Sequence, residues 1–463
     1  MYKIKFGTDG WRAIIAETYT IDNLKRVAYA TAKWVKQHQN LNQSIVLGYD
    51  CRFGGELFAK TTAAVYAAEG LKVLMTHTFV TTPIISMGAL HYQTALGIIL
   101  TASHNPASYN GYKVKANFGG PASPQVITEI ENLIPEKHTS ELGNFETYKE
   151  KGLIEFVDLD TLYYNLVDKA FDLSLINKLK FGYDAMYGSG QAIGKRIMPN
   201  ATYLHCDYNP SFMGQAPEPI HKNLTAFSAL LKNSNDLQAG LANDGDADRI
   251  GLYDNEGNFV DSHHIILLLI HYLHKVKNYT GKVVIAASVT DKVKKLCDLY
   301  NLEYEVTKVG FKYIAEKMVT EDVLIGAEES GGIAVKGHIP ERDGIWVGLL
   351  IFEYMAKTGK SLKALINEIY EQVGAFFYKR NDLHITEALK QGALEKCRAG
   401  IKQFGEFEVI NEDTTDGFRY TLPNDQWLMI RASGTEPVLR VYAESTNEAG
   451  ADKILAAAQK VLL

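Results

Sequence analysis

The sequence predicts an α/β protein with three related α/β domains and a smaller C-terminal α+β domain around a central cleft. Short β-branched runs alternate with longer segments that have the periodicity of amphipathic helices, which is typical of α/β folds. This pattern occurs three times, and each time a polar segment rich in glycine or aspartate follows the third strand. The 463 residues are enough for three or four domains of ordinary size.

The first unit has predicted strands at 44–49, 72–75 and 95–100, with a helix between the first two, and ends in TASHNP at 101–106. The second has strands at 179–183, 202–205 and 238–242, followed by NDGDADR at 243–249. The third has strands at 282–286, 303–306 and 322–325, followed by GAEESGG at 326–332. Because parallel sheets bind ligands beyond the carboxyl ends of their strands, the three loops are expected to face one cleft.

The pattern changes beyond about residue 370. We expect a strand at 375–386, a helix at 387–404, a hairpin of 418–422 with 427–432, a strand at 438–444 and a closing helix from 449. This smaller domain carries RASGTEP at 431–437. The predicted domains are 1–145, 146–257, 258–370 and 371–463.

Composition narrows the class of protein. Hydrophobic residues make up 46% and charged residues 22%, as in a folded chain, and the net charge of −6 argues against nucleic acid or a membrane surface as a partner. No apolar run approaches the ~20 residues that a membrane span needs, and the N-terminus has no signal-peptide pattern. The four cysteines are isolated, which fits a reducing compartment. We therefore expect a cytoplasmic protein, and the net charge does not exclude small anionic substrates.

The acidic loop after the second unit is the strongest chemical signal. Asp244, Asp246 and Asp248 occupy alternate positions, so an extended backbone would place their carboxylates on one side. Three such charges repel one another unless a cation neutralises them, and oxygen ligands favour Mg²⁺, Ca²⁺ or Mn²⁺. An EF-hand is excluded because its glycine position holds Arg249. The alternative is a solvated acidic turn.

The other three loops are weaker signals when each is taken alone. Ser103 and His104 precede an Asn-Pro turn that would hold the serine outward, although such a pair is often only a turn. Glu328 and Ser330 could bind sugar hydroxyls, or could belong to a capped turn. A charged fork, two hydroxyls and a flexible glycine would suit a phosphate dianion, and they are supplied by Arg431, Ser433, Thr435 and Gly434.

Together, FGTDGWR, TASHNP, DGDADR, GAEESGG and RASGTEP resemble the motifs of the α-D-phosphohexomutase family, in family order and over essentially the whole chain. The resemblance implies an isomerase that carries a phosphoryl group on Ser103 and binds Mg²⁺ through Asp244, Asp246, Asp248 and a phosphoserine oxygen. Arg249 would face the transferring phosphate, and His104 and Lys113 are the candidates for proton transfer. The resemblance also implies substrate-binding residues, which are Arg12, Lys308, Glu328, Ser330, His338, Arg342, Arg431, Ser433 and Thr435.

The implied reaction interconverts hexose 1-phosphate and hexose 6-phosphate through a hexose 1,6-bisphosphate, which also serves as activator. Phosphomannomutase/phosphoglucomutase members often have a histidine two residues after the loop serine, where this chain has Gly332. This difference favours glucose as the sugar. The alternatives are a phosphomannomutase, a phosphoglucosamine mutase or a phosphopentomutase. A phosphoserine phosphatase and a non-catalytic phosphosugar-binding protein rank lower, because they do not need all the loops.

Overall fold

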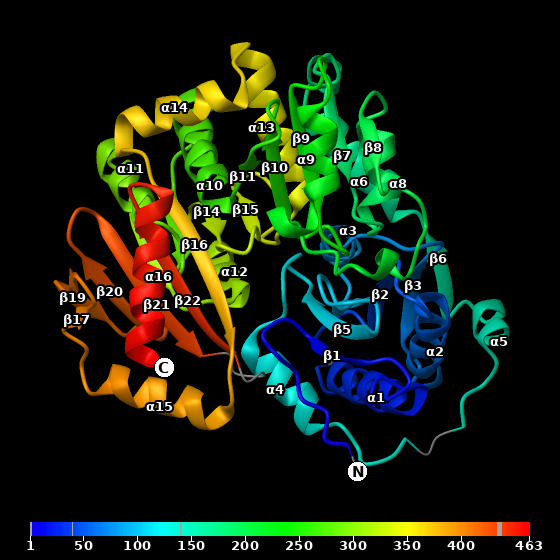
Figure 1. Cartoon of the computed structure of the whole chain (residues 1–463). Coiled ribbons are helices and arrows are strands. Elements are labelled where there is room, and N and C mark those ends of the chain that lie inside the picture. Colours follow the sequence, from blue (N-terminus) through cyan, green and yellow to red (C-terminus); the bar gives the residue numbers. More distant parts are fainter. Residues whose placement is uncertain (1, 39, 139–140, 433–437) are drawn as a thin grey trace. The chain divides into compact units, whose positions relative to one another are not determined.

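The computed structural model describes residues 2–38, 40–138, 141–432 and 438–463 (Figure 1). The chain divides into two compact units, and each is formed from two separate stretches. The first unit comprises Met1–Lys282 and Gly310–Leu365, and the second comprises Val283–Val309 and Ile366–Leu463. Within the described ranges, no helix is both long and apolar enough to cross a membrane.

The N-terminal sheet has six strands in the order β1-β5-β4-β2-β3-β6. The strands are β1 Trp11–Ile14, β2 Ser44–Tyr49, β3 Lys72–Thr76, β4 Leu96–Leu100, β5 Tyr109–Ala116 and β6 Ile154–Val157. The helices around it are α1 Ile21–Gln37, α2 Gly55–Ala68, α3 Thr82–His91, α4 Pro124–Asn132, α5 Phe145–Glu150 and α6 Leu159–Ala170. Strands β2, β3, β4 and β6 pair in parallel, whereas β5 pairs antiparallel with β4 and β1.

Alternation along β2 explains why helices cover both faces of this sheet. Ile45 and Leu47 belong to the core that includes residues of α1 and α2, which lie side by side in Figure 1. Val46 and Gly48 point to the opposite face, where a β-carbon at Gly48 would lie 2.6 Å from Ile85 of α3. A strand that is buried on both faces reads as a continuous apolar run, and this is why β2 and β4 could be predicted closely.

The second sheet also belongs to the first unit and has the order β11-β10-β9-β7-β8. Its strands are β7 Phe181–Asp184, β8 Thr202–Leu204, β9 Ala239–Asn243, β10 Ile250–Asp254 and β11 Phe259–Val260. The accompanying helices are α7 Leu173–Ile176, α8 Gly190–Ile197, η1 Phe212–Gly214, η2 His221–Asn223 and α9 Thr225–Lys232. Strand β7 pairs in parallel with β8 and β9, and β9 pairs antiparallel with β10.

The third repeat contributes strands to both units. Its strands are β12 Lys282–Ala286, β13 Tyr304–Thr307, β14 Val323–Ala327 and β15 Ile333–Val335. Its helices are α10 Ser262–His271, the π-helical turn η3 Tyr272–Val276, α11 Lys292–Tyr300, α12 Phe311–Thr320, α13 Gly344–Thr358 and α14 Leu362–Val373. Strands β12 and β13 pair in parallel, and β14 and β15 pair antiparallel.

Each of the three chemically rich loops has the same structural setting. TASHNP connects β4 to β5, NDGDADR connects β9 to β10, and GAEESGG connects β14 to β15. In every case the two strands are antiparallel neighbours. Each loop is therefore the turn of a hairpin, of which the sequence analysis predicted the first strand and missed the second.

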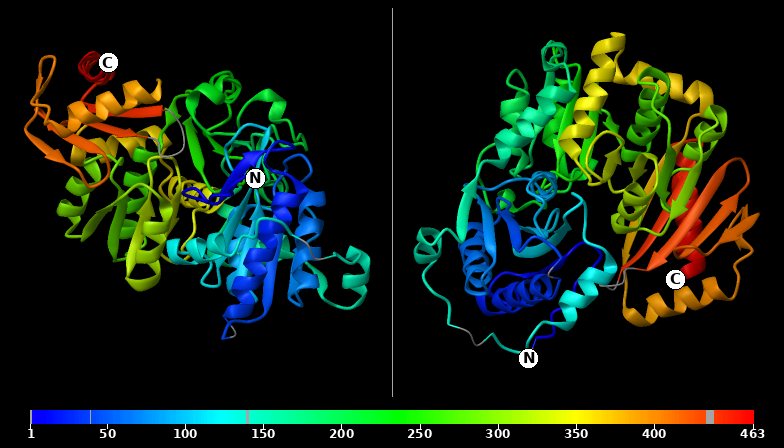
Figure 2. Two further views of the ribbon diagram at one scale, coloured as in Figure 1. Left: turned by 90° about the horizontal axis from the view of Figure 1, so that it is seen from below. Right: turned by 180° about the vertical axis from the view of Figure 1, so that it is seen from behind.

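The second unit contains a sheet in the order β16-β22-β21-β20-β19. Its strands are β16 Phe377–His384, β19 Asn411–Asp413, β20 Phe418–Leu422, β21 Gln426–Ala432 and β22 Val438–Ser445, with a separate pair β17 Gln403–Phe404 and β18 Phe407–Glu408. The helices are α15 Glu387–Arg398 and α16 Glu448–Leu462, and α16 lies against one face of the sheet (Figures 1 and 2). The predicted helix 387–404 is too long, because Gly400 has φ +86° and residues 403–404 form β17.

Candidate active site

Ser103 lies in the β4–β5 hairpin loop and is only 1% exposed. Its Oγ donates a hydrogen bond of 2.8 Å to Oδ2 of Asp244, which is 141 residues away in the chain. Nδ1 of His104 lies 3.4 Å from the same Oγ. Ser103 has φ +53°, in the left-handed region that residues other than glycine seldom adopt. The fold therefore brings the predicted serine loop against the predicted metal loop.

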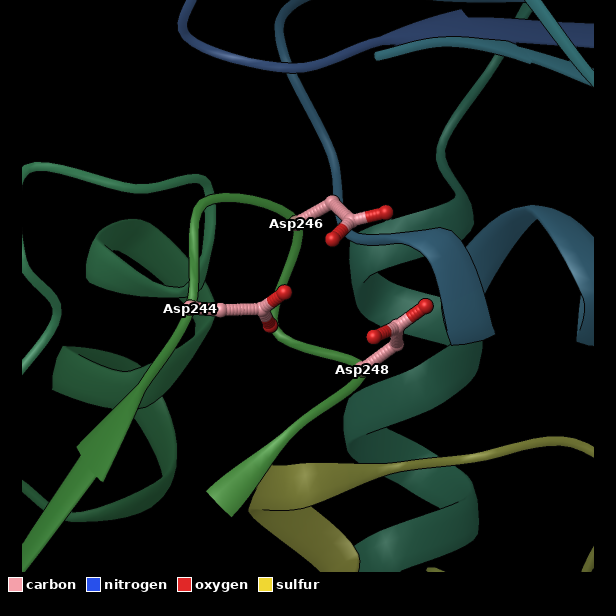
Figure 3. Close-up of side chains that lie close together, drawn as sticks. All are labelled: Asp244, Asp246 and Asp248. Atoms are coloured by element: carbon pink, nitrogen blue, oxygen red, sulfur yellow. The ribbon is translucent and has the colours of Figure 1, made fainter. Parts of the chain in front are cut away.

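Asp244, Asp246 and Asp248 are fully buried in the β9–β10 loop, and their carboxylates point toward a common space (Figure 3). One oxygen from each lies within 4.8 Å of the others. Among the described residues, Oδ1 of Asp246 and Oδ1 of Asp248 have no hydrogen-bond partner. Buried carboxylate oxygens without a partner are costly, so this donor set fits a hard divalent cation such as Mg²⁺.

Lys113 supplies a positive charge to the same cluster. Its Nζ lies 2.8 Å from Oδ2 of Asp246, 3.0 Å from Oδ2 of Asp248 and 2.8 Å from Oδ2 of Asp9. Thr82 completes the surroundings of Asp246 by donating its hydroxyl to Oδ2 at 2.5 Å. Each of Asp246 and Asp248 therefore has one oxygen engaged by protein donors and one oxygen left for another ligand.

Arg342 is also part of this network. Its Nη2 donates to Oδ2 of Asp248 at 2.6 Å and to Oδ2 of Asp9 at 2.7 Å, and its Nη1 lies 3.7 Å from Oε2 of Glu328. The arginine that was expected to line the substrate site is placed between the metal loop and the GAEESGG loop. Asp9 was missed as a site residue, although it stands in the FGTDGWR motif that carried the resemblance.

The charges shift the ionisation of these groups. Burial and the neighbouring carboxylates of Asp246 and Asp248 hold the pKa of Asp244 well above its usual range. Burial opposes ionisation of Asp246 too, but the Lys113 ammonium outweighs it and holds that pKa below its usual range. Burial, followed by the guanidinium of Arg249, lowers the pKa of His104. The pKa values of Asp244 and Asp246 are thus shifted in opposite directions.

Two further arginines border the serine and metal loops. Nη1 of Arg12 donates to the side-chain oxygen of Asn105 at 2.7 Å, two residues after Ser103. The backbone N–H of Arg249 donates to Oδ1 of Asp244 at 3.0 Å, while its guanidinium lies 3.8 Å from Glu218. The Arg12 guanidinium therefore contacts the serine loop, whereas Arg249 contacts Asp244 through its backbone N–H.

The GAEESGG loop is attached to the metal loop by backbone contacts. The N–H of Ile250 donates to the carbonyl of Gly331 at 3.2 Å, and Arg249 and Gly332 form an isolated antiparallel bridge. Glu328 is 6% exposed and accepts a hydrogen bond from the N–H of Gly310 at 3.0 Å, while Ser330 is partly exposed. Burial raises the pKa of Glu328. The GAEESGG loop and the loop of the three aspartates are thus held together within the first unit.

His338 has a different environment. Its Nε2 lies 2.9 Å from Oδ2 of Asp343, and its ring stacks on Trp346 with 3.8 Å between the centroids. Asp343 also accepts the hydroxyl of Tyr163 at 2.8 Å and caps α13. These contacts place His338 in the packing around α13. Among the described residues, none of its contacts is with Asp244, Asp246 or Asp248.

The remaining predicted residues lie in the second unit. Arg431 is at the end of β21, and its Nε donates to Oδ2 of Asp416 at 3.0 Å. The same carboxylate oxygen accepts the N–H of Val309 at 2.8 Å, so it joins the Arg431 strand to the segment that carries the exposed Lys308. Ser433 and Thr435 lie outside the described residues.

Comparisons with known proteins support the family resemblance that the loop motifs indicated. Profiles of the four phosphoglucomutase/phosphomannomutase domains match this chain: alpha/beta/alpha domains I, II and III match residues 3–141, 161–257 and 261–373, and the C-terminal domain matches residues 394–461. The chain is 26% identical over 463 residues to the phosphoglucomutase/phosphomannomutase of Thermococcus kodakarensis, covering 99% of this chain and 98% of the relative. It is 28% identical over 458 residues to the phosphoglucosamine mutase of Limosilactobacillus reuteri, covering 95% and 94%.

A solved structure is similar over the full length. The crystal structure of a Thermus thermophilus protein named as a phosphomannomutase has a TM-score of 0.87 at 30% identity, covering 100% of this chain and 99% of that one. Four matching domain profiles, the shared fold and the loop motifs in family order along the sequence lead to one conclusion. The chain belongs to the phosphoglucomutase/phosphomannomutase family, the α-D-phosphohexomutases, which move a phosphoryl group within a sugar phosphate.

Proposed function

We propose that this phosphohexomutase works through a phosphoserine at Ser103 and a hexose 1,6-bisphosphate. The observation that carries the proposal is the 2.8 Å contact between Oγ of Ser103 and Asp244, inside a cluster of three aspartates and Lys113. Phosphoryl transfer depends mainly on positioning and on neutralising charge, and the cluster supplies both.

The site residues have distinct roles in this proposal. Asp244, Asp246 and Asp248 hold Mg²⁺, which when bound neutralises charge on the transferring phosphoryl group. A free sugar hydroxyl forms a new bond to phosphorus, the bond to Oγ of Ser103 breaks, and the hydroxyl proton passes to a nearby base. His104 and Lys113 remain the candidates for that proton transfer. The bisphosphate then turns round and returns its other phosphoryl group to Ser103.

Substrate binding is assigned to two sets of residues. Glu328 and Ser330 bind sugar hydroxyls, while Arg12 and Arg249 face the reacting phosphate. In the second unit, Arg431 grips the non-reacting phosphate, and its ion pair with Asp416 holds the guanidinium in place. The remaining members of the proposed binding set are Lys308, His338, Arg342, Ser433 and Thr435.

For the sugar, we propose glucosamine phosphate in place of the glucose phosphate that Gly332 favoured. The support is that the relatives include phosphoglucosamine mutase at 28% identity over 95% of the chain. Gly332 has a local explanation that does not involve the sugar. A β-carbon there would lie 2.4 Å from Cδ of Arg342, so a histidine at this position would displace the arginine that binds Asp248.

The test compares turnover on the 1-phosphates of glucosamine, glucose, mannose and ribose, with Mg²⁺ and glucose 1,6-bisphosphate present. We expect the highest kcat/KM for glucosamine 1-phosphate, a phosphate on Ser103 by mass spectrometry, and no steady turnover by Ser103→Ala. Normal turnover by Ser103→Ala would refute the phosphoserine. Higher kcat/KM for glucose would refute only the choice of sugar. Release of free phosphate in place of isomerised product would favour a phosphatase.

A further inference from the structure

Arg52 is a fully buried arginine that sequence reasoning did not select, and it holds the loop that carries Ser103. It follows β2 in the sequence Tyr49-Asp50-Cys51-Arg52, and its side chain is 0% exposed. Its guanidinium donates to the backbone carbonyls of three residues of the β4–β5 loop and of the first residue of β5. These are Ser103 at 2.7 Å, Asn105 at 2.7 Å, Pro106 at 2.8 Å and Tyr109 at 2.9 Å.

Asp50 and Thr101 hold the other side of the same serine. Nε of Arg52 donates to Oδ2 of Asp50 at 3.1 Å, and that oxygen also accepts the hydroxyl of Thr101 at 2.5 Å. Oγ1 of Thr101 then accepts the backbone N–H of Ser103 at 2.9 Å. With this carboxylate, all five guanidinium N–H groups of Arg52 are used. The backbone groups of Ser103 are thus fixed from both sides.

The conformation of Ser103 explains why such support is needed. A serine at φ +53° occupies a strained region, which persists only when its surroundings determine it. The Ser103 carbonyl also lies against the metal loop, where a β-carbon on Gly245 would approach it to 2.4 Å. If the loop relaxed, Oγ would leave Asp244.

We propose that Arg52, supported by Asp50 and Thr101, is the positioning residue that fixes Ser103 for phosphoryl transfer. The inference rests on the proposed function, since it assumes that Ser103 carries the phosphoryl group. Arg52 does not contact the reacting atoms. It acts through the backbone of the loop, and a displacement of about 1 Å in such a site can cost on the order of 100-fold in rate.

The chain contains a matched control for the role of a buried arginine. Arg26 is 7% exposed and donates to the carbonyls of Pro135 at 2.7 Å and Tyr2 at 3.2 Å. Like Arg52, it holds backbone in the N-terminal domain, but it holds a different segment. Arg52→Lys and Arg26→Lys both keep the charge and lose the planar fork, so a general loss of packing should affect both.

The experiment measures phosphorylation of Ser103 by glucose 1,6-bisphosphate in a single turnover with Mg²⁺, followed by intact mass. In this step the Oγ–phosphorus bond forms and the bond between phosphorus and the sugar oxygen breaks. The serine hydroxyl loses its proton, the sugar oxygen gains one, and a hexose monophosphate leaves. We expect Arg52→Lys to slow the step about 100-fold, with the half-saturating concentration of glucose 1,6-bisphosphate changed less than about threefold. Arg26→Lys should lower Tm with little effect on the rate. Wild-type rate in Arg52→Lys, or equal slowing in both variants, would overturn the inference.

A second pair of variants decides the matter if Arg52→Lys does not fold. Thr101→Val removes the acceptor of the Ser103 N–H, and Thr101→Ser retains it. We expect Thr101→Val to slow phosphorylation at least about tenfold and Thr101→Ser to restore most of the rate. Equal rates in the two would overturn the inference. If wild-type protein takes up no phosphate on Ser103, the proposed function fails instead, so the two failures are distinguishable.

Discussion

Replacing Lys113 by methionine tests the charge balance of the site, because it removes one ammonium group and keeps an unbranched side chain of similar length. Nζ of Lys113 lies within 3.0 Å of Asp9, Asp246 and Asp248. Removing one partner from a buried ionic cluster typically costs about 3–5 kcal/mol. At about 2 °C per kcal/mol for a large domain, Tm in EDTA should fall by about 6–10 °C. Mg²⁺ should restore at least half of that loss, since a cation between the carboxylates replaces the missing charge.

Lys115 is the matched control for this variant. It lies two residues further along β5 on the same face, is fully buried, and pairs with Glu341 at 2.8 Å. Lys115→Met should therefore lose a similar Tm in EDTA but gain no more from Mg²⁺ than the wild type does. Thermal unfolding of the three proteins in EDTA and in Mg²⁺ gives the comparison. An equal Mg²⁺ response in the two variants would refute the reasoning.

Three further changes test other parts of the molecule. Asp248→Asn removes one charge from the metal cluster, so the Mg²⁺ concentration needed for half-maximal activity should rise at least about tenfold, as titration of apoenzyme would show. Arg431→Ala should raise KM and lower kcat/KM by about one to two decades in steady-state kinetics, because a charge-assisted contact is worth about 1.5–3 kcal/mol. An unchanged KM would contradict the proposal that Arg431 binds the non-reacting phosphate. Burial raises the folded-state pKa of Glu444 to about 7 from an ordinary 4.5. The folded state then binds this proton more tightly than the unfolded state. The free energy of unfolding therefore falls by up to about 3 kcal/mol as pH rises from about 4.5 to about 7. Glu444→Gln should raise Tm at pH 8 and leave it unchanged at pH 4.

The parallel strands and the acidic loop could be predicted because their signals are local. Strand β2 is an apolar run of six residues, and its predicted limits 44–49 equal the observed ones. Asp244, Asp246 and Asp248 stand at alternate positions, so their proximity follows from the backbone itself. The helix periodicity was a weaker guide at the ends, as α15 shows by ending at Arg398.

The partners of Lys113 could not be predicted, because they depend on contacts over more than 100 residues. In β5, the alternation of Lys113 and Lys115 with apolar residues is typical of a strand with one solvent-facing side. Both lysines are buried instead, against carboxylates from other parts of the chain. Arg52 is hidden for the same reason, since its acceptors are backbone carbonyls that carry no sequence signal.

The division of the chain into interleaved stretches has a consequence for biosynthesis. Residues 283–309 belong to the same compact unit as 366–463, and Arg419 binds the carbonyl of Ala287 at 2.7 Å and Asp291 at 2.9 Å. During translation this segment leaves the ribosome more than one hundred residues before Trp427, which belongs to the same hydrophobic cluster as Ala287. The apolar surface of residues 283–309 therefore stays exposed until the C-terminal part of the chain emerges. In that interval, chaperones should bind mainly to this segment.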